Sequence, residues 1–437
     1  MKLNWFSPLP PAPTDIGHFT KRVLPALAAR ADVSLWTDQT KWEPGLAEHA
    51  EIRRYDLHHP PWADLNRADV CVYNIGNNPL FHGSIWQIAR QHAGVVILHD
   101  TSLHHFFDGL YRVQRRDLST YLELMEFYYG AEGRQDAYEC FMAEARNINE
   151  MAEKYPLTEL AVANALGVIV HTEPALAALS QSVPFMLRCL PLPFALPRIE
   201  HDRKVRNRAT PYRLILFGYL GRNRRLEAVF QALADFPERE KFHLDIYGSV
   251  LDDEKQLRSQ LRSLGIRSLV TFHGFATEGV LDEALAKADL AINLRYPTMG
   301  EASGSQLRIW AHTLPSLVTN VGWYSTLSDE AVAFVRADVN EVADIQAHLR
   351  DFLEQPDRFV KMGAHGCNIL AQQHAPESYV KNLLEFLTEA SQYRAPAAAL
   401  KLAERAGELT SELMSKPSDS ILTNVAGEIG ALAGMDQ

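Results

Sequence analysis

The sequence predicts an α/β protein with two doubly wound, Rossmann-like parallel sheets that face each other across a cleft. Apolar runs of strand length alternate with helical patterns along most of the chain, which is typical of a parallel sheet covered on both faces. The alternation stops at a proline-rich and then charged stretch, 191–211, and starts again after it. A length of 437 residues also indicates more than one domain.

We expect the first domain to span residues 1–198 and the second to span 199–375, with the charged run 199–211 as a linker. A helix at 376–394 should return towards the first domain, and a helix-prone tail follows at 395–437. Within the first domain, residues of about 108–165 carry helical patterns rich in Tyr, Glu and Arg. We therefore expect a helical insertion there.

The first domain should open with a strand, a proline-rich loop and a helix. MKLNWF is expected to form a short strand, and the helical pattern FTKRVLPALAAR begins just after Gly17. A glycine at a helix entrance lets a ligand approach the backbone closely. The alternative is that Gly17 serves only the turn. Further strands of this domain are expected at 32–37, 51–57, 69–76 and 94–100.

Polar side chains follow two of these strands, at the edge where open α/β sheets place their ligands. Asn77 and Asn78 follow DVCVYNIG, and His99 and Asp100 end GVVILHD. A histidine–aspartate pair at a strand end is a candidate for catalysis, although a lone histidine is more often structural. Asp100 would either orient His99 or cap the next helix.

Neither a metal nor an organic cofactor is predicted. His99, His104 and His105 lie close together in the chain, but their spacing matches no standard metal site. The four cysteines lack CxxC spacing, so they indicate neither a zinc site nor a disulfide framework and fit a reducing cytoplasm.

The second domain has glycines and arginines where its first strand ends. Gly218 closes the apolar run YRLILFG, and Arg222, Arg224 and Arg225 precede the next helical pattern. Glycines allow close backbone approach, and arginines form charge-assisted hydrogen bonds, so this loop is a candidate phosphate site. The alternative is a solvated basic turn, because a Gly-x-x-Gly pattern alone is weak.

A second candidate loop follows the apolar strand 288–294. Free N–H groups of the turn made by Ser303, Gly304 and Ser305 would bind an anion at the start of a helix. The lone acid Glu301 would instead accept hydrogen bonds from the hydroxyl groups of a sugar. The alternative is an ordinary strand–helix turn with an exposed glutamate.

Both loops should open at the carboxyl edge of one sheet, so a nucleotide diphosphate would fit between them with its sugar towards Glu301. Gly17 and His99 would face it from the first domain. The net charge of -11 argues against nucleic acid as the main partner.

The order of several motifs resembles that of GT-B glycosyltransferases of the large retaining family 4. LPPAPTDIGHFTKRVLPAL resembles that family's glycine loop and the helix after it. LFGYLGRNRRLEAVFQAL resembles the donor-phosphate loop, and VTFHGF and ALAKADLAINL resemble the nucleotide-facing strand and its successor. YNIGNNPLFHGSIW and VVILHDTSLHHFF resemble stretches of a bacterial subgroup. The resemblance covers about residues 1–390.

The resemblance implies transfer of a hexose from a nucleotide sugar to a saccharide or lipid-linked acceptor, with retention at the anomeric carbon. The setting would be bacterial polysaccharide or glycoconjugate synthesis, and no metal would be required. His99 would bind the reacting sugar. The nucleotide would be held by Tyr247, Gly248, His273, Gly274 and Phe275, and the acceptor side of the cleft would include Asn77, Asn78 and His104.

One signature departs from the family pattern of two glutamates separated by seven residues. Aligned on Pro315, the second position holds Arg308, and the first falls on Gly300 beside Glu301. We interpret this as a variant GE-x-SG motif that lacks the usual ribose-binding carboxylate. Two alternatives stay open: a catalytically silent GT-B subunit that supports a partner enzyme, and a GT-B nucleotide-sugar epimerase. A phosphorylase is disfavoured because no lysine is suitably placed for pyridoxal phosphate.

We expect a cytoplasmic location. The start, MKLNWFSPLPPAPTD, has no long apolar segment of the kind found in signal peptides, and no window of about 18 residues is apolar enough to cross a bilayer. A lipid-linked acceptor would bring the protein to the inner membrane face as a peripheral protein. The tail from Ala395 is a candidate for self-association.

Overall fold

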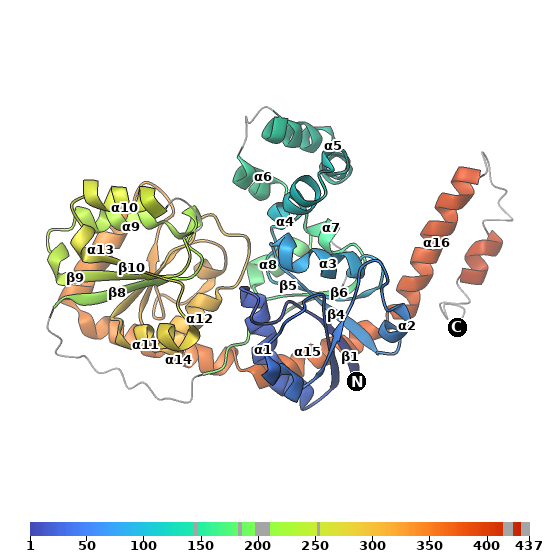
Figure 1. Cartoon of the computed structure of the whole chain (residues 1–437), viewed down its shortest axis with the longest axis horizontal. Helices are drawn as coiled ribbons and strands as arrows, with labels where there is room; N and C mark the ends of the chain where they lie inside the picture. The colour runs from blue at the N-terminus through green and yellow to red at the C-terminus, as the bar shows by residue number, and fades with distance from the viewer. Residues whose placement is uncertain (143–146, 182–185, 197–209, 251–253, 414–422, 430–437) are drawn as a thin grey trace. The chain divides into compact units, whose positions relative to one another are not determined.

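The computed structural model describes residues 1–142, 147–181, 186–196, 210–250, 254–413 and 423–429 (Figure 1). The chain forms two compact units. Unit 1 comprises Met1–Leu190 and Tyr379–Gln437, and unit 2 comprises Pro191–Ser378. Residues 199–209 of the expected linker lie outside the described residues, as do 414–422 and 430–437 of the expected tail.

Within the described residues, unit 1 has a seven-stranded parallel sheet in the order β3-β2-β1-β4-β5-β6-β7. The strand order reverses between β1 and β4, so the loops after these two strands diverge and leave room for a ligand at their carboxyl ends. The strands are β1 (Lys2–Phe6), β2 (Asp32–Thr37), β3 (Glu51–Arg54), β4 (Val70–Ile75), β5 (Gly94–Leu98), β6 (Ala165–Val170) and β7 (Met186–Cys189).

Helices cover both faces of this sheet (Figure 1). Helix α1 (Asp15–Ala28) and helix α15 (Pro376–Ser391) lie on one face, and α3 (Pro79–Ala89) lies on the other. The described part of the segment predicted as an insertion is mainly helical and packs over α3, where the Trp86 ring meets that of Tyr111 at 6.4 Å between centroids. The remaining described helices of residues 1–190 are η1 (Pro44–Glu48), α2 (Trp62–Leu65), α4 (His104–Asp108), η2 (Gly109–Gln114), α5 (Leu118–Met142), α6 (Ile148–Lys154), α7 (Thr158–Val162) and α8 (Glu173–Leu179).

Unit 2 repeats the design with a parallel sheet in the order β10-β9-β8-β11-β12-β13, whose order reverses between β8 and β11. The strands are β8 (Tyr212–Phe217), β9 (Phe242–Tyr247), β10 (Val270–Gly274), β11 (Leu290–Asn293), β12 (Ser316–Thr319) and β13 (Ala333–Val335). The helices are α9 (Leu226–Ala234), α10 (Glu254–Ser263), α11 (Glu278–Lys287), α12 (Gly304–Ala311), α13 (Glu341–Glu354) and α14 (Pro356–Gln373), with short turns η3 (Arg222–Arg224), η4 (Arg239–Lys241), η5 (Arg267–Leu269) and η6 (Gly322–Thr326).

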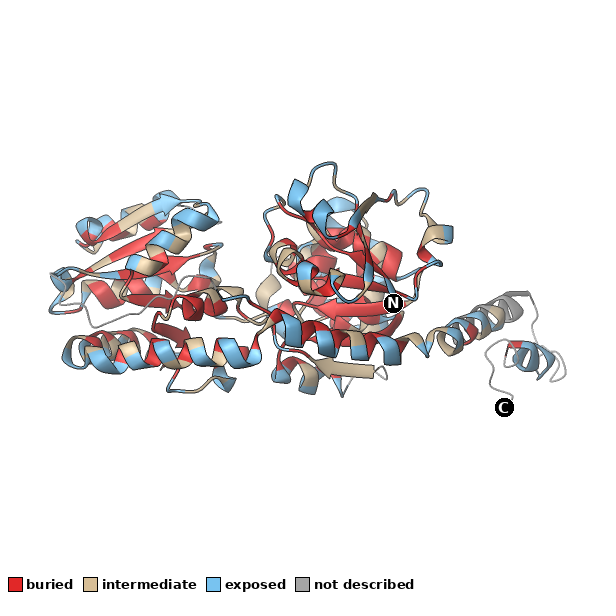
Figure 2. Cartoon of the chain, turned by 90° about the horizontal axis from the view of Figure 1, so that it is seen from below, coloured by how far each residue is buried: buried red, intermediate tan, exposed pale blue. Residues whose placement is uncertain are grey.

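The pleat of β8 explains why its last four residues, Leu214–Phe217, are all apolar. Leu214 and Leu216 pack with α9 and α13 on one face, whereas Ile215 and Phe217 pack with α11 and α12 on the other. Successive side chains of a strand point to opposite faces, so a strand covered on both sides needs apolar residues at every position. In Figure 2 the inner strands of both units are coloured as buried, whereas the edge strands β3, β7 and β10 are only partly buried.

Helix α16 (Arg394–Leu413) continues from α15 and begins the predicted helical tail. The guanidinium of Arg394 donates to the carbonyl of Ala68 at 3.0 Å and to the side chain of Asn66 at 2.8 Å, which anchors the start of the helix on unit 1. No described helix is both long and apolar enough to cross a membrane.

Candidate active site

The end of strand β8 forms a tightly packed glycine corner in unit 2. Gly218 has a φ of 116°, a conformation that favours glycine, and its N–H donates to the Tyr247 carbonyl at 3.0 Å. A Cβ on Gly248 would lie 1.8 Å from the carbonyl oxygen of Gly218, so only glycine lets the two strand ends meet this closely. A Cβ on Gly218 would lie 3.9 Å from Ser305 Oγ and 4.0 Å from an Arg224 nitrogen. The corner therefore brings Gly218, Ser305 and Arg224 together.

Helix α12 begins beside this corner and points its free N–H groups outwards. Ser303 is the N-cap, and its hydroxyl accepts from the N–H of Gln306 at 3.1 Å. In the described part of the chain no acceptor is bonded to the N–H groups of Gly304 and Ser305. Free amides and the positive end of the helix dipole make such a position favourable for an anion.

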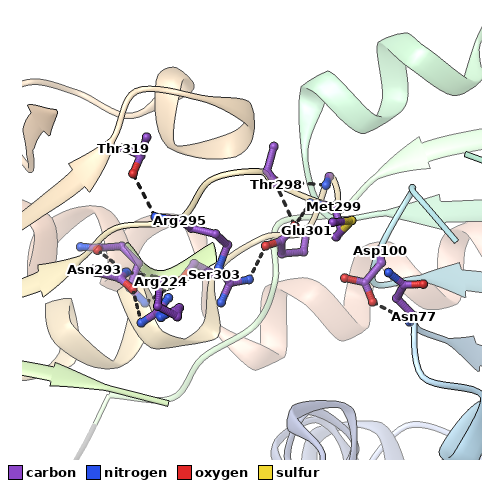
Figure 3. A network of polar contacts seen from close by, with 12 residues as sticks. Asn77, Asp100, Arg224, Asn293, Arg295, Thr298, Met299, Glu301, Ser303 and Thr319 are labelled. Atoms are coloured by element: carbon purple, nitrogen blue, oxygen red, sulfur yellow. Dashed lines mark hydrogen bonds and ion pairs between the residues drawn. The ribbon is translucent and has the colours of Figure 1, made fainter. Parts of the chain in front are cut away.

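A buried polar network holds the start of helix α12 in place. The Asn293 amide donates to Gln306 Oε1 at 3.0 Å, and the Gln306 amide donates to Ser316 Oγ at 2.8 Å. Arg224 joins the network, donating to Asn293 Oδ1 at 3.1 Å and to the Phe217 carbonyl at 2.8 Å. The ends of β8 and β11 are thereby held to α12 (Figure 3).

The three arginines expected to bind phosphate have different roles, and this corrects the sequence interpretation. Arg224 is 2% exposed and is committed to the network just described. Arg225 makes a bidentate ion pair with the buried Glu341 of α13, at 2.6 Å for the shorter contact. The hydrogen bonds that Arg225 donates to Glu341 raise the pKa of Arg225 against the opposing effect of burial. Arg222 is exposed, and its guanidinium contacts no carboxylate among the described residues, so it is the arginine available to a ligand.

Glu301 organises the second loop rather than standing exposed on it. Its carboxylate pairs with Arg295, and its second oxygen accepts from the Met299 N–H at 2.7 Å and from the Thr298 hydroxyl at 3.0 Å (Figure 3). Burial alone would raise the pKa of Glu301, but the charge of Arg295 and hydrogen bonds to the carboxylate lower it overall. Glu301 is therefore ionised at neutral pH, and its side chain is 11% exposed.

The two loops form one piece of structure. The N–H of Tyr296, in the Glu301 loop, donates to the carbonyl of Asn223, in the arginine loop, at 2.8 Å. The N–H of Arg295 also donates to the Thr319 hydroxyl at 2.9 Å, which ties the loop to the end of β12. A change in the conformation of either loop should therefore alter the conformation of the other.

The five residues expected to hold the nucleotide lie at the ends of β9 and β10. The rings of Tyr247 and His273 stack at 4.1 Å between centroids, and the Gly248 N–H donates to the Gly274 carbonyl at 2.7 Å. His273 also contacts Asp245 at 2.7 Å. Phe275, just beyond, is 72% exposed. The sequence placed these residues near one another, but it did not single out Asp245.

Arg308, which occupies the unusual position in the glutamate signature, faces helix α11. It donates to Asp282 at 2.9 Å and to the Glu278 carbonyl at 3.1 Å. His312 contacts the same Asp282 carboxylate at 3.0 Å. Arg308 thus joins α12 to α11.

In unit 1, Gly17 serves the chain's own packing. A Cβ at this position would lie 3.3 Å from the Pro10 nitrogen and 3.4 Å from the Leu9 carbonyl carbon. The proline-rich loop therefore occupies the close approach that we expected a ligand to use, which corrects the assignment of Gly17 to the phosphates. The turn-only alternative fits the structure better.

Asp100 does not cap the next helix, so that alternative is wrong. The N-cap of α4 is Leu103, without a side-chain cap. Asp100 instead accepts from the Asn77 N–H at 2.8 Å (Figure 3), and the Asn77 side chain accepts from the Phe106 N–H at 3.0 Å. Asn78 is the N-cap of α3. Asn77, Asn78 and Asp100 thus shape the loops after β4 and β5.

His104 is a core residue, and its assignment to the acceptor cleft is wrong. It is fully buried, with Nδ1 at 2.6 Å from the Tyr155 carbonyl and Nε2 at 2.7 Å from the Tyr121 hydroxyl. Burial lowers its pKa to about 4, so the ring is neutral. A polar residue with both nitrogens used inside the fold has nothing left for a ligand.

His99 lies in an aromatic cluster at the carboxyl end of β5. Its ring is 4.7 Å from that of Phe19 and 4.9 Å from that of His171, and its Nε2 is 3.1 Å from Asn74 Oδ1. Burial, together with His171 and His82, lowers the pKa of His99 well below its usual value. The sequence did not indicate this cluster, because its members are far apart in the chain. Within the described residues, no group of three or more His, Cys, Asp or Glu side chains is arranged to hold a metal ion.

Comparisons with known proteins agree with this architecture. Residues 197–369, which lie in unit 2, match the family model described as glycosyl transferases group 1. No curated protein matches the chain.

Several solved structures share the fold across most of the chain. Anabaena Alr3699/HepE in complex with UDP is 14% identical, with a TM-score of 0.59 over 89% of this chain and 100% of that chain. Sucrose-phosphate synthase from Thermosynechococcus elongatus is 15% identical, with a TM-score of 0.61 over 89% and 98%. WaaG, a glycosyltransferase involved in lipopolysaccharide biosynthesis, is 16% identical, with a TM-score of 0.57 over 88% and 99%. The chain therefore has the GT-B fold, and residues 197–369 of unit 2 match the model of group 1 glycosyl transferases.

Proposed function

We propose that this protein is a retaining glycosyltransferase that moves a hexose from a nucleotide sugar to a saccharide or lipid-linked acceptor, in bacterial polysaccharide or glycoconjugate synthesis. The observation that carries the proposal is the anion site of unit 2, where the glycine corner at Gly218 meets the free amides of Gly304 and Ser305. Alr3699/HepE was crystallised with UDP and with UDP-glucose, which supports a uridine diphosphate sugar as the first donor to test.

The site supplies what a departing diphosphate needs. Negative charge grows on the leaving group in the transition state, and preorganised donors stabilise it most effectively. The amides of Gly304 and Ser305 and the exposed Arg222 are such donors, and the buried polar network behind α12 holds the amides in place. We propose that these groups replace a metal ion and that no cofactor is used.

The sugar would be held by other groups. We propose that His99 contributes a hydrogen bond to the transferred hexose, and that Glu301 accepts from its hydroxyls with the lone pairs that its own loop leaves open. The residues near the donor base would be Tyr247, His273 and Phe275. We further propose a cytoplasmic enzyme that reaches the inner membrane face through a lipid-linked acceptor, and self-association through the tail.

The first test is a thermal-shift screen against UDP, GDP, dTDP, ADP and their hexose derivatives, with and without magnesium. A ligand that binds the native state raises the melting temperature in proportion to its affinity and concentration. We expect one nucleotide to stabilise the protein without magnesium, and Arg222→Ala to weaken that effect. Arg350→Ala, which removes another exposed arginine of unit 2, is the matched control. The absence of any shift would argue against the nucleotide-sugar proposal.

A second candidate function is a catalytically silent subunit, and Arg308 is the observation that favours it. The arginine pairs with Asp282 where the family pattern has an acid, so a carboxylate contact to the nucleotide is not available from that position. Slow hydrolysis of a bound nucleotide sugar by this protein would exclude the proposal that it is a catalytically silent subunit. Conversion to a second nucleotide sugar would instead indicate an epimerase.

A further inference from the structure

Three histidines gather at the carboxyl ends of the unit 1 strands, and each has one ring nitrogen fixed by the fold. His82 Nδ1 is 2.9 Å from the Asn74 carbonyl, and His171 Nδ1 is 2.9 Å from the Leu190 carbonyl. A carbonyl oxygen can only accept, so both rings must carry their proton on Nδ1. His99 differs, because its bond is made by Nε2 to the side chain of Asn74.

The orientation of the Asn74 amide follows from its other partner. Asn74 is fully buried in β4, and its Nδ2 is 2.9 Å from the carbonyl oxygen of Phe6 in the neighbouring strand β1. The end of the amide that faces a carbonyl must be the NH2 group, so the end that faces His99 is the oxygen. An oxygen there can only accept, which requires the proton of the neutral His99 ring to sit on Nε2.

This arrangement leaves Nδ1 of His99 as a bare lone pair. The neutral ring is favoured because burial and the neighbouring histidines lower the pKa of His99 far below neutrality. His99 keeps 9% of its surface exposed, and nothing in the described residues bonds to Nδ1. The nitrogen is therefore available to a ligand, and it can accept but cannot donate.

We propose that Asn74 is a positioning residue that holds His99 in the Nε2–H form, so that Nδ1 selects a sugar hydroxyl over a carboxylate. The inference rests on the proposed function, which supplies the ligand, the sugar of a nucleotide-sugar donor. It adds the class of that sugar: a neutral hexose is accepted and a hexuronate is disfavoured. A hydroxyl donates its proton to the lone pair. A carboxylate oxygen can only accept, so it would face the Nδ1 lone pair without a hydrogen bond in a buried setting. This costs about 1–3 kcal/mol, which corresponds to about a 5- to 140-fold lower rate with the hexuronate donor.

The tautomer can be measured without any substrate. The full-length protein labelled with 15N-histidine gives long-range 15N–1H spectra that separate protonated from unprotonated ring nitrogens, and His99→Gln assigns the signal. We expect unprotonated Nδ1 in the wild type and a mixed or reversed tautomer in Asn74→Ala. Asn4→Ala is the matched control, because Asn4 is also a buried strand asparagine whose amide donates to a backbone carbonyl, in its case that of Leu65. A wild-type His99 protonated on Nδ1 would overturn the proposal.

Selectivity is measured with UDP-glucose and UDP-glucuronate as donors, by release of UDP. We expect UDP-glucose to be used at least about fivefold better by the wild type and by Asn4→Ala, and the preference to shrink severalfold in Asn74→Ala. Equal use of the two donors, or an unchanged preference in Asn74→Ala, would contradict the inference. If neither donor is used, the proposal of a UDP-sugar donor fails, while the spectra alone still decide the role of Asn74.

Discussion

Replacing Glu301 with glutamine should loosen the loop that it organises, because the wild-type carboxylate uses both oxygens. One oxygen pairs with Arg295, and the other accepts from Met299 N–H and from the Thr298 hydroxyl. Glutamine has a single carbonyl oxygen. If that oxygen faces Arg295, its NH2 group faces the Met299 N–H, and two donors are opposed.

The cost follows from these contacts. A buried donor left without its acceptor costs about 1–3 kcal/mol, and the lost charge on the Arg295 bond adds about 1 kcal/mol. We therefore expect the loop to open more easily by about 2 kcal/mol or more. Because 1.36 kcal/mol is about a tenfold change in an equilibrium constant, hydrogen exchange at Met299 should speed up by about 30-fold or more.

Hydrogen–deuterium exchange of the peptide that covers residues 295–303 measures this opening at pH 7. Glu354→Gln is the control, since Glu354 is exposed and forms no ion pair within the described residues. The folded pKa of Glu301 lies below its usual value of 4.5, so its contribution is complete above that value and is lost as the pH falls through the folded pKa. An unchanged exchange rate at Met299 would refute the reasoning.

Three further predictions concern packing and ionisation. Arg225→Ala removes the bidentate partner of the buried Glu341, so the unfolding free energy of unit 2 should fall by about 2–4 kcal/mol in urea titrations, whereas Arg225→Lys should recover part of the loss. Gly248→Ala places a methyl group 1.8 Å from the Gly218 carbonyl and should abolish nucleotide-induced thermal shifts even where the circular dichroism stays native. The folded pKa of His104 is about 4, below its usual 6.5, so its contribution to stability is complete above pH 6.5 and is lost as the pH falls towards 4; the urea midpoint of His104→Gln should therefore change less between pH 7 and pH 5 than that of the wild type.

Much of the fold was predictable because strand patterns are local. The apolar run of β8 and the glycines after it are visible in the sequence, and so is the return of the same alternation after the charged stretch. The roles of the three arginines were not predictable, because residue type does not show which side chain turns inwards. Arg224 is buried where the Phe217 carbonyl and the side-chain oxygen of Asn293, from strand β11, accept its hydrogen bonds. Similarly, Arg225 pairs with an acid 116 positions away in the chain.

The candidate site of unit 1 shows the same limit. His99 at the end of an apolar run was a reasonable catalytic candidate from the sequence, and His104 was expected on the acceptor side of the cleft. Only the structure shows that both nitrogens of His104 are used within the fold, while His99 keeps one free of partners in the described residues. A polar residue inside an apolar strand, such as Asn74, was the one local signal that could have indicated the network behind His99.

The remaining question for Glu301 is whether it binds the sugar or only holds its loop, and affinity measurements separate the two roles. The Glu301 loop is bonded to the arginine loop through Tyr296 and Asn223, so an organising role transmits damage to the diphosphate site. In that case Glu301→Gln should lower the affinities for UDP and for UDP-glucose by the same factor in calorimetric titrations. A direct contact to the hexose predicts the opposite pattern, in which UDP binds normally and only UDP-glucose binds less tightly. Since the carboxylate already has three partners within its loop, we expect the affinity for UDP to fall, and an unchanged UDP affinity would restore the direct contact as the main role of Glu301.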